Sequence, residues 1–172
     1  MEGLILEELR KEIADAIPSL RRYARALLGG RGEADDLVHD TLVRAMERLH
    51  LFRADSDMRA WLFTILHNQH INAVRHDARR PENVPVEESA NAEPAAQDGR
   101  LAVRDLDRAL ALLPDEQRQV VLLIGLEGLS YAEASDVLDV PLGTVMSRLN
   151  RGRQQLRGLM EQGPAQSIRR IK

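Results

Sequence analysis

The segment "SYAEASDVLDVPLGTVMSRLNRGRQQLR", residues 130–157, predicts two helices joined by a sharp turn, which restricts the folds open to this chain. Ser130 and Glu133 form the S-x-x-E pattern of a capping box, in which each side chain satisfies an unpaired backbone donor at a helix start. The first helix must end near Asp139, because Pro141 disfavours helical geometry before it and suits the first turn of a new helix. The segment therefore predicts a helix-turn-helix.

The second helix of this pair has an apolar face and a polar face. Spacings of four, three and four residues place Val145, Leu149, Gly152 and Leu156 on one side, which we expect to be buried. The opposite side carries small, polar and basic residues: Gly143, Ser147, Asn150, Arg151 and Gln154, flanked by Thr144, Arg148, Arg153 and Arg157. Such a helix can enter the major groove of DNA with its N-terminal half near the base edges. An ordinary solvated helix face is the alternative, and the capped first helix and tight turn make it less favoured.

Composition favours a small all-α protein. The chain has 172 residues, of which 44% are hydrophobic and only 3% aromatic, so the core must consist of Leu, Val, Ile and Ala. Hardly any strand pattern is present. There is no cysteine, which excludes disulfides and thiolate metal sites, and the five histidines form no metal-ligand pattern. We therefore expect no metal or other cofactor. The absence of cysteine and of a long apolar run predicts a location in the reducing cytoplasm without membrane insertion.

Charge is distributed unevenly around a net charge of −3. Residues 59–80 hold four Lys or Arg against one Asp or Glu, and residues 139–172 hold seven against two. Residues 81–138 are acidic, with four basic side chains against twelve acidic ones. Two short basic surfaces on an acidic chain indicate contact with nucleic acid.

Periodicity and helix breakers predict helices over most of the chain. Their expected ranges are 4–16, 18–29, 33–50, 57–78, 101–113 and 114–128, followed by the helix pair described above. Residues 81–100 contain three prolines, five acidic residues and no aromatic residue, so we interpret them as a linker. The predicted organisation is a helical domain at 1–80, the linker at 81–100, a second helical domain at 101–160 and a basic tail at 161–172.

The helix expected at 57–78 carries an unusual stripe. Trp61, Asn68, Asn72 and Arg75 fall within an arc of about 60° on a helical wheel. A single tryptophan is usually part of a core, but buried amides need hydrogen-bond partners. From the pattern alone, packing or capping and a polar binding surface both remain open.

Four features together resemble the extracytoplasmic-function (ECF) sigma factors of bacterial RNA polymerase. They are "EADDLVHDTLVRAM", "DMRAWLFTILHNQHINAVR", "LPDEQRQVVLLIGLEGLSYAEASDVLDVPLGTVMSRLNRGRQQL" and the proline-rich acidic gap. The resemblance covers nearly the whole chain, with region 2 at 1–80 and region 4 at 101–160. It implies a subunit that binds core RNA polymerase, recognises the minus-35 and minus-10 promoter elements and assists promoter melting, in a stress or envelope response under an anti-sigma factor.

The resemblance also implies site residues. Those expected on the clamp helices of the largest polymerase subunit are Asp35, Asp36, Leu37, Asp40, Thr41 and Arg44. Those expected at the minus-10 element, where a base is flipped into a pocket, are Arg53, Asp55, Ser56, Trp61, Asn68, Asn72, Arg75, Arg79 and Arg80. Those expected at the minus-35 element are Thr144, Met146, Ser147, Arg148, Asn150 and Arg151. The flap of the second-largest subunit is a further expected contact.

Three positions depart from the family pattern. Met146 stands where relatives often have lysine or arginine, His39 where they often have glutamine, and Asp139 where glycine is common, although aspartate tolerates left-handed geometry. Two other functions stay open: a sigma-like mimic that sequesters an anti-sigma factor, and a helix-turn-helix transcriptional regulator. An enzyme is not expected, because no nucleophile, carboxylate pair or phosphate loop is found. We expect a monomer whose two domains are joined by a flexible linker.

Overall fold

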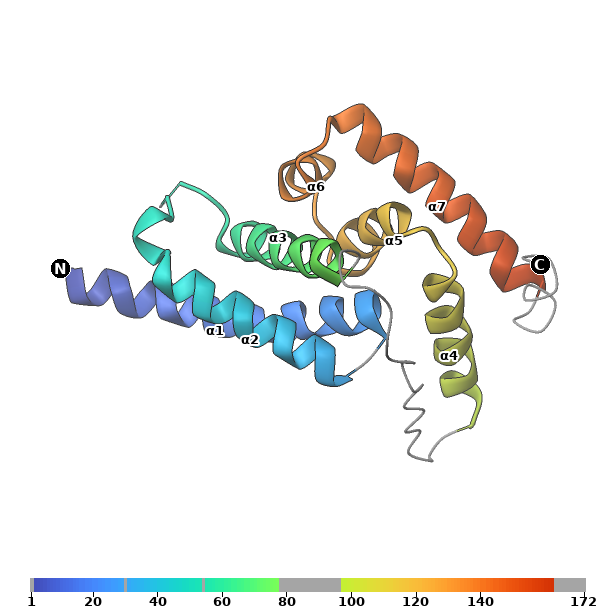
Figure 1. Cartoon of the computed structure of the whole chain (residues 1–172), viewed down its shortest axis with the longest axis horizontal. Helices are drawn as coiled ribbons and strands as arrows, with labels where there is room; N and C mark the ends of the chain where they lie inside the picture. The colour runs from blue at the N-terminus through green and yellow to red at the C-terminus, as the bar shows by residue number, and fades with distance from the viewer. Residues whose placement is uncertain (1, 30, 54, 78–96, 163–172) are drawn as a thin grey trace.

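The computed structural model describes residues 2–29, 31–53, 55–77 and 97–162, and these form helices without any strand (Figure 1). The first group consists of α1 (Glu2–Leu28), α2 (Arg31–Glu47), the 3₁₀ turn η1 (Leu49–Leu51) and α3 (Met58–Asp77). The second group consists of α4 (Gln97–Ala111), α5 (Asp115–Val121), its π-helical continuation η2 (Leu122–Leu126), α6 (Tyr131–Leu138) and α7 (Leu142–Gln162). This confirms the predicted all-α fold with two helical domains.

α1 corrects one prediction, because the chain passes through Pro18 as a single helix and does not begin a second one there. Proline inside a helix loses one backbone hydrogen bond and costs on the order of 3 kcal/mol. Buried side chains lie on one stripe along both sides of it: Ile13, Ala16, Leu20, Tyr23, Ala24 and Leu27. Burial of this uninterrupted stripe offsets the cost of the proline and keeps one helix axis.

The N-terminal domain is a three-helix bundle in which α1, α2 and α3 all pack on one another. Its centre is an edge-to-face pair of fully buried rings, Tyr23 and Phe63, with centroids 5.2 Å apart. Leu20, Leu62 and Leu66 surround them without exposure. Each such leucine contributes about 1.5–3 kcal/mol by leaving water, so three helices with few aromatic residues suffice for a core.

The C-terminal domain is organised around α7, which packs on α4, α5 and α6. The face predicted from spacing is confirmed, because Val145, Leu149 and Gly152 are buried and Leu156 is half-buried. Arg118 of α5 joins α5 to α4 and also bridges to α1 of the N-terminal domain. Its guanidinium donates hydrogen bonds of 2.9–3.0 Å to the carbonyl oxygens of Leu110 and Ala111 at the end of α4, of Leu113 just after it and of Leu27 at the end of α1. Cationic groups are favourable at helix C-termini, where carbonyls lack partners.

The turn geometry predicted around α6 is confirmed. The Glu133 backbone N–H donates to the Ser130 hydroxyl at 3.2 Å, and the Ser130 N–H donates to the Glu133 carboxylate at 2.7 Å. These bonds to Ser130 lower the pKa of Glu133. Asp139 ends the helix with a φ of 51°, in the left-handed region that aspartate tolerates. Pro141 then precedes α7, as the sequence indicated.

Element boundaries differ from prediction by a few residues. α4 begins at Gln97, so the last four residues assigned to the linker belong to a helix. α2 ends at Glu47 and is followed by η1, whereas one helix was expected to 50. Most of the predicted linker and tail, together with Arg79 and Arg80, lie outside the described residues.

Candidate nucleic-acid and protein interfaces

The exposed tip of α7 brings together five of the six residues predicted for the minus-35 element. Met146, Ser147, Asn150 and Arg151 are exposed and Thr144 is half-buried beside them. The Ser147 hydroxyl donates to the Thr144 carbonyl at 3.0 Å, and Arg151 donates to the Ser147 carbonyl and hydroxyl at 3.3 Å. These weak bonds hold the Arg151 guanidinium near the N-terminal half of the helix, where it remains in water.

Arg148 is placed differently. Its side chain is only 19% exposed and its Nη2 lies 2.9 Å from Glu116 Oε2 at the start of α5. The Glu116 side chain is itself 69% exposed. Arg148 therefore joins two helices of the domain and is less accessible to another molecule than its neighbours on the tip.

The stripe on α3 forms an exposed polar face beside an aromatic wall. Trp61 is half-buried against the Phe52 ring, with centroids 5.3 Å apart, whereas Asn68, Asn72 and Arg75 are exposed. Within the described residues the Asn68 side chain is exposed and makes no hydrogen bond, so it caps no backbone group there. The amide is available to a ligand.

The loop before α3 adds charged groups next to this face. Arg53 and Asp55 form a two-bond ion pair, with Nε–Oδ1 at 3.2 Å and Nη2–Oδ2 at 3.0 Å. Both side chains are exposed, as is Ser56, whose N–H donates to the Arg53 carbonyl at 2.9 Å. Asp57 caps α3 by accepting from the Ala60 N–H at 2.7 Å, which fixes the loop to the helix.

α2 presents an acidic face with one correction to the predicted set. Asp35, Asp36, Asp40 and Arg44 are exposed and Leu37 is half-buried, whereas Thr41 is fully buried and its hydroxyl donates to the Leu37 carbonyl at 2.7 Å. Thr41 therefore faces the bundle and has no surface for a partner. Asp35 also lies 3.3 Å from Arg25 and 3.8 Å from Arg21 of α1, so part of this face is already paired.

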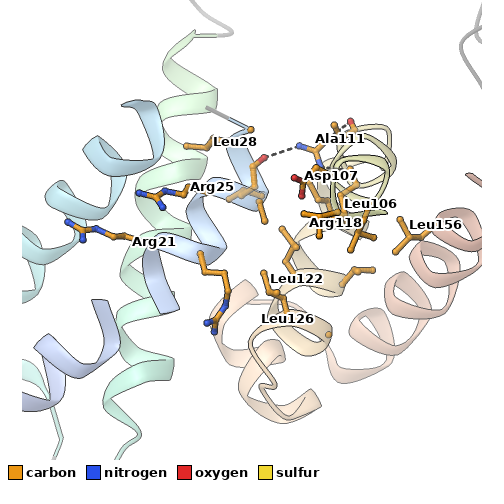
Figure 2. Close-up of a pocket in the computed structure, with 18 of the residues that line it drawn as sticks. Arg21, Arg25, Leu28, Leu106, Asp107, Ala111, Arg118, Leu122, Leu126 and Leu156 are labelled. Atoms are coloured by element: carbon orange, nitrogen blue, oxygen red, sulfur yellow. Dashed lines mark hydrogen bonds between the residues drawn. The ribbon is translucent and has the colours of Figure 1, made fainter. Parts of the chain in front are cut away.

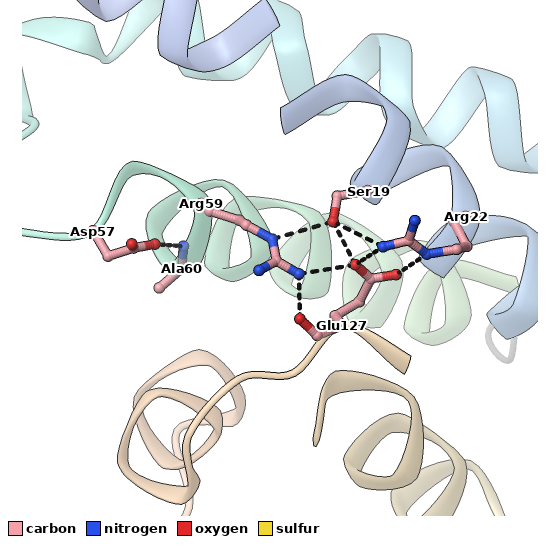
Figure 3. Close-up of polar contacts among 6 residues, drawn as sticks. All are labelled: Ser19, Arg22, Asp57, Arg59, Ala60 and Glu127. Carbon is pink, nitrogen blue, oxygen red and sulfur yellow. Dashed lines mark hydrogen bonds and ion pairs between the residues drawn. The ribbon is translucent and has the colours of Figure 1, made fainter. Parts of the chain in front are cut away.

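A buried ionic cluster between the two domains was not predicted (Figure 3). The Glu127 carboxylate, with a side chain that is 0% exposed, accepts from Arg22 at 2.7 and 2.9 Å, from Arg59 at 2.9 Å and from the Ser19 hydroxyl. Arg59 also donates to the Glu127 backbone carbonyl. The bond to Glu127 raises the pKa of Arg22. The partners lie 108, 105 and 68 positions from Glu127, so no local pattern could indicate this cluster.

A groove of about 1030 Å³ lies where α1 meets α4, α5, η2 and α7 (Figure 2). Its apolar lining includes Leu27, Leu106, Leu110, Leu122 and Leu156. One acidic residue, Asp107, also lines the groove. The arginines that line it number five: Arg21, Arg22, Arg25, Arg118 and Arg153. Burial raises the pKa of Asp107. The groove is therefore apolar inside and basic around its edge, although the chain as a whole is acidic.

Two other kinds of site are absent from the part of the chain that the structure describes. No group of three His, Asp or Glu side chains there could hold a metal ion. None of the helices described there has the length and apolar character needed to span a membrane.

Comparison with known proteins identifies both domains. The family "Sigma2 domain of PhyR" matches residues 13–67, and "Sigma-70, region 4" matches residues 104–156. The chain is 34% identical to the ECF RNA polymerase sigma factor EcfG of Rhodopseudomonas palustris, covering 97% of this chain and 96% of that protein. It is 38% identical to the ECF sigma factor SigE of Mycolicibacterium smegmatis, covering 88% of this chain and 60% of that protein.

Two solved structures share the fold. The sigma factor RpoE of Bartonella quintana, in complex with the anti-sigma factor NepR, is 33% identical with a TM-score of 0.76, covering 90% of this chain and 98% of that one. CnrH, in complex with the cytosolic domain of CnrY, is 27% identical with a TM-score of 0.69, covering 91% and 89%.

A region 2 bundle followed by a region 4 helix-turn-helix defines a sigma factor, the subunit that directs RNA polymerase to promoters. The chain belongs to the ECF RNA polymerase sigma factors.

Proposed function

We propose that this sigma factor reads promoters through two separate surfaces, the tip of α7 at the minus-35 element and the α3 face at the minus-10 element. The observation that carries the proposal is the exposure of polar side chains on both surfaces, where packing does not require them. Arg151 and Asn150 on α7 present donors of the kind that read base edges in the major groove. Arg148, which is 19% exposed and paired with Glu116, would contribute less than these two.

On α3 the chemistry suits a single-stranded base. Asn68 and Asn72 supply amide donors and acceptors for the edge of an extruded base, and Trp61, fixed against Phe52, supplies a firm wall. Arg75 near the C-terminal end of α3 and the Arg53–Asp55 loop before its N-terminal end would meet the backbone at opposite ends of this face. Arg79 and Arg80 are proposed for the same role on sequence alone, because they lie outside the described residues.

For core polymerase we propose the acidic face of α2 as the docking surface on the clamp helices of the largest subunit. Asp35, Asp36, Asp40 and Arg44 are exposed and Leu37 is partly so, which suits a partner that bears arginines. Thr41 is omitted because it is buried. Region 4 would contact the flap of the second-largest subunit. The protein would act by binding, in the cytoplasm where core polymerase works, and without chemistry of its own.

We also propose control by an anti-sigma factor, in a stress or envelope response. The structural relative RpoE of Bartonella quintana is bound to the anti-sigma factor NepR, and the groove beside α1 and α4 offers a place for such a factor here. Arg21, Arg25 and Arg153 are exposed at this apolar groove, and their charge suits a segment that carries both apolar and acidic side chains.

One experiment tests the central proposal. Core polymerase is supplied with a library of promoters, with and without this protein, and the transcripts are sequenced. We expect transcripts that depend on the protein and share two conserved elements. A specific observation favours a second candidate: the region 2 match is to a domain of PhyR, and PhyR of Bartonella quintana is an anti-anti-sigma factor that forms a complex with NepR. Absence of protein-dependent transcripts from the whole library would favour that mimic.

A further inference from the structure

The two domains pack directly on each other in this structure. α6 lies against α3, and α1 contacts both η2 and α4 (Figure 1). The Glu127 cluster lies at this junction, with Glu127 contributed by the C-terminal domain and Ser19, Arg22 and Arg59 by the N-terminal one. The charge of Glu127 also reaches the bundle centre, where burial and this carboxylate raise the pKa of Tyr23.

This packed arrangement is too small for the proposed promoter contacts. Elements centred near positions −10 and −35 are about 25 base pairs apart, which is about 85 Å along straight B-DNA at about 3.4 Å per base pair. A compact chain of this length has a radius of gyration of about 16 Å, hence a diameter of about 40 Å. The α3 face and the α7 tip cannot reach both elements until the domains separate.

The chemistry of the cluster suits a contact that must break. A buried ion pair gains little net free energy, because both charges lose their hydration, whereas a buried charge that lacks its partner is strongly unfavourable. On separation Glu127, Arg22 and Arg59 all return to water, and the side chains of Arg22 and Arg59 are already 52% and 38% exposed. The cluster therefore opposes opening moderately and does not hold either domain folded.

We infer that the Glu127 cluster is an interdomain latch, which holds the sigma factor in a closed state that is unable to contact both promoter elements. The inference depends on the proposed promoter reading only for the functional consequence of the closed state. The latch itself concerns the equilibrium between closed and open molecules and can be measured without DNA or polymerase. Opening of the latch would then be a step in the formation of the active holoenzyme.

The test measures the distance between the two domains in the whole protein. The chain has no cysteine, so Lys11→Cys on α1 and Gln155→Cys on α7, both at exposed positions, accept a pair of spin labels without competition. In the otherwise unchanged protein we expect one dominant, short distance. With Glu127→Gln, the ratio of long to short distances should rise about tenfold, because both guanidinium groups lose their anionic partner and the amide offers one acceptor oxygen in place of two.

Two further variants sharpen the test. Arg22→Gln with Arg59→Gln should open the molecule more than Glu127→Gln does, because the closed state would then bury an unpaired carboxylate. Asp105→Asn is the matched control, since Asp105 pairs with Arg108 at 3.7 Å within α4 and does not bridge the domains. It should leave the distances unchanged. Helix content is recorded for every sample by circular dichroism.

A short distance retained in both Glu127→Gln and the double arginine variant overturns the latch, as does an equal shift in Asp105→Asn. If Glu127→Gln loses helix content, the test uses the double arginine variant alone, and a short distance retained in that variant overturns the latch. Promoter-library transcription by the same samples is a separate readout. If the variants lengthen the interdomain distance as expected but no sample supports transcription, the proposed function is refuted and the latch is still supported.

Discussion

Arg148 and Glu116 form an ion pair of 2.9 Å that joins α7 to α5, while Arg151, three residues further along α7, has no carboxylate partner among the described residues. Both arginines were predicted to meet the minus-35 element from the same sequence pattern. The structure separates them, because one supports the domain and the other remains free to contact a ligand. Their substitutions should therefore have different consequences.

Arg151→Ala should weaken binding to a minus-35 duplex by about 1–3 kcal/mol and relax the preference at one base pair, because a bidentate arginine distinguishes guanine from other bases. The melting temperature should not change, since the side chain is exposed. Fluorescence anisotropy on duplexes varied at each position measures the first effect and thermal unfolding the second. Arg148→Ala is the comparison and should lower stability by up to about 1 kcal/mol. Unchanged affinity of Arg151→Ala for every duplex would rule out base reading.

Gly152→Ala should destabilise the C-terminal domain by about 1 kcal/mol. A Cβ at this position would lie 2.8 Å from Val121 Cγ2 and 3.3 Å from Gln117 Cβ, and valine is stiff at χ1. Overpacking costs about 1–3 kcal/mol, which exceeds the gain of about 1 kcal/mol from replacing glycine in a helix. Gly158→Ala on the same helix is the control, because no atom lies within 4 Å of its added Cβ. It should raise stability in urea unfolding, and equal effects at both positions would contradict the packing argument.

Local signals predicted the helix-turn-helix well. The capping box, the left-handed Asp139 and the buried face of Val145 and Leu149 each depend on residues within one or two helical turns. Steric and hydrogen-bonding rules act over that range, so the sequence alone indicates them. The exposed tip of α7 followed from the same periodicity.

Features that depend on distant parts of the chain could not be predicted in this way. Pro18 signals a helix break locally, but burial of the stripe on both sides of it outweighs that signal. Thr41 matches a family contact position, yet the packing of α2 turns it inward. Glu127 finds its partners more than 60 positions away, and the pairing of the two domains that creates its site leaves no periodic pattern in the sequence.

Acidification should destabilise the protein through α3. Burial, with His70 nearby, lowers the pKa of His67 to about 4, and burial lowers that of His70, with Arg118 adding to the effect and Asp115 opposing it. The pKa of a histidine in an unfolded chain is about 6.5. The folded state thus favours the neutral rings of His67 and His70. Their contribution to the free energy of unfolding is complete above about pH 6.5 and is lost as the pH falls toward 4.

Thermal unfolding between pH 7.5 and pH 4.5 measures this effect. His67→Gln, which cannot gain a proton, should flatten the loss of melting temperature across that window relative to the parent protein. His39→Gln on α2 is the control, because His39 is exposed. If both variants follow the parent curve, His67 does not carry the pH dependence.

Asn68→Ala should change which base is accepted at one minus-10 position while leaving stability intact. The Asn68 side chain is exposed and makes no hydrogen bond within the described residues, so its loss removes no hydrogen bond there. An amide offers one acceptor and two donors and can distinguish base edges, whereas alanine leaves only shape. Open-complex yield on promoters varied at each minus-10 position measures discrimination, and thermal unfolding of the same samples measures stability. Asn72→Ala, one turn further along the same face, shows whether neighbouring positions are read separately. A marked loss of stability with unchanged base preference would assign Asn68 a structural role and remove it from the reading surface.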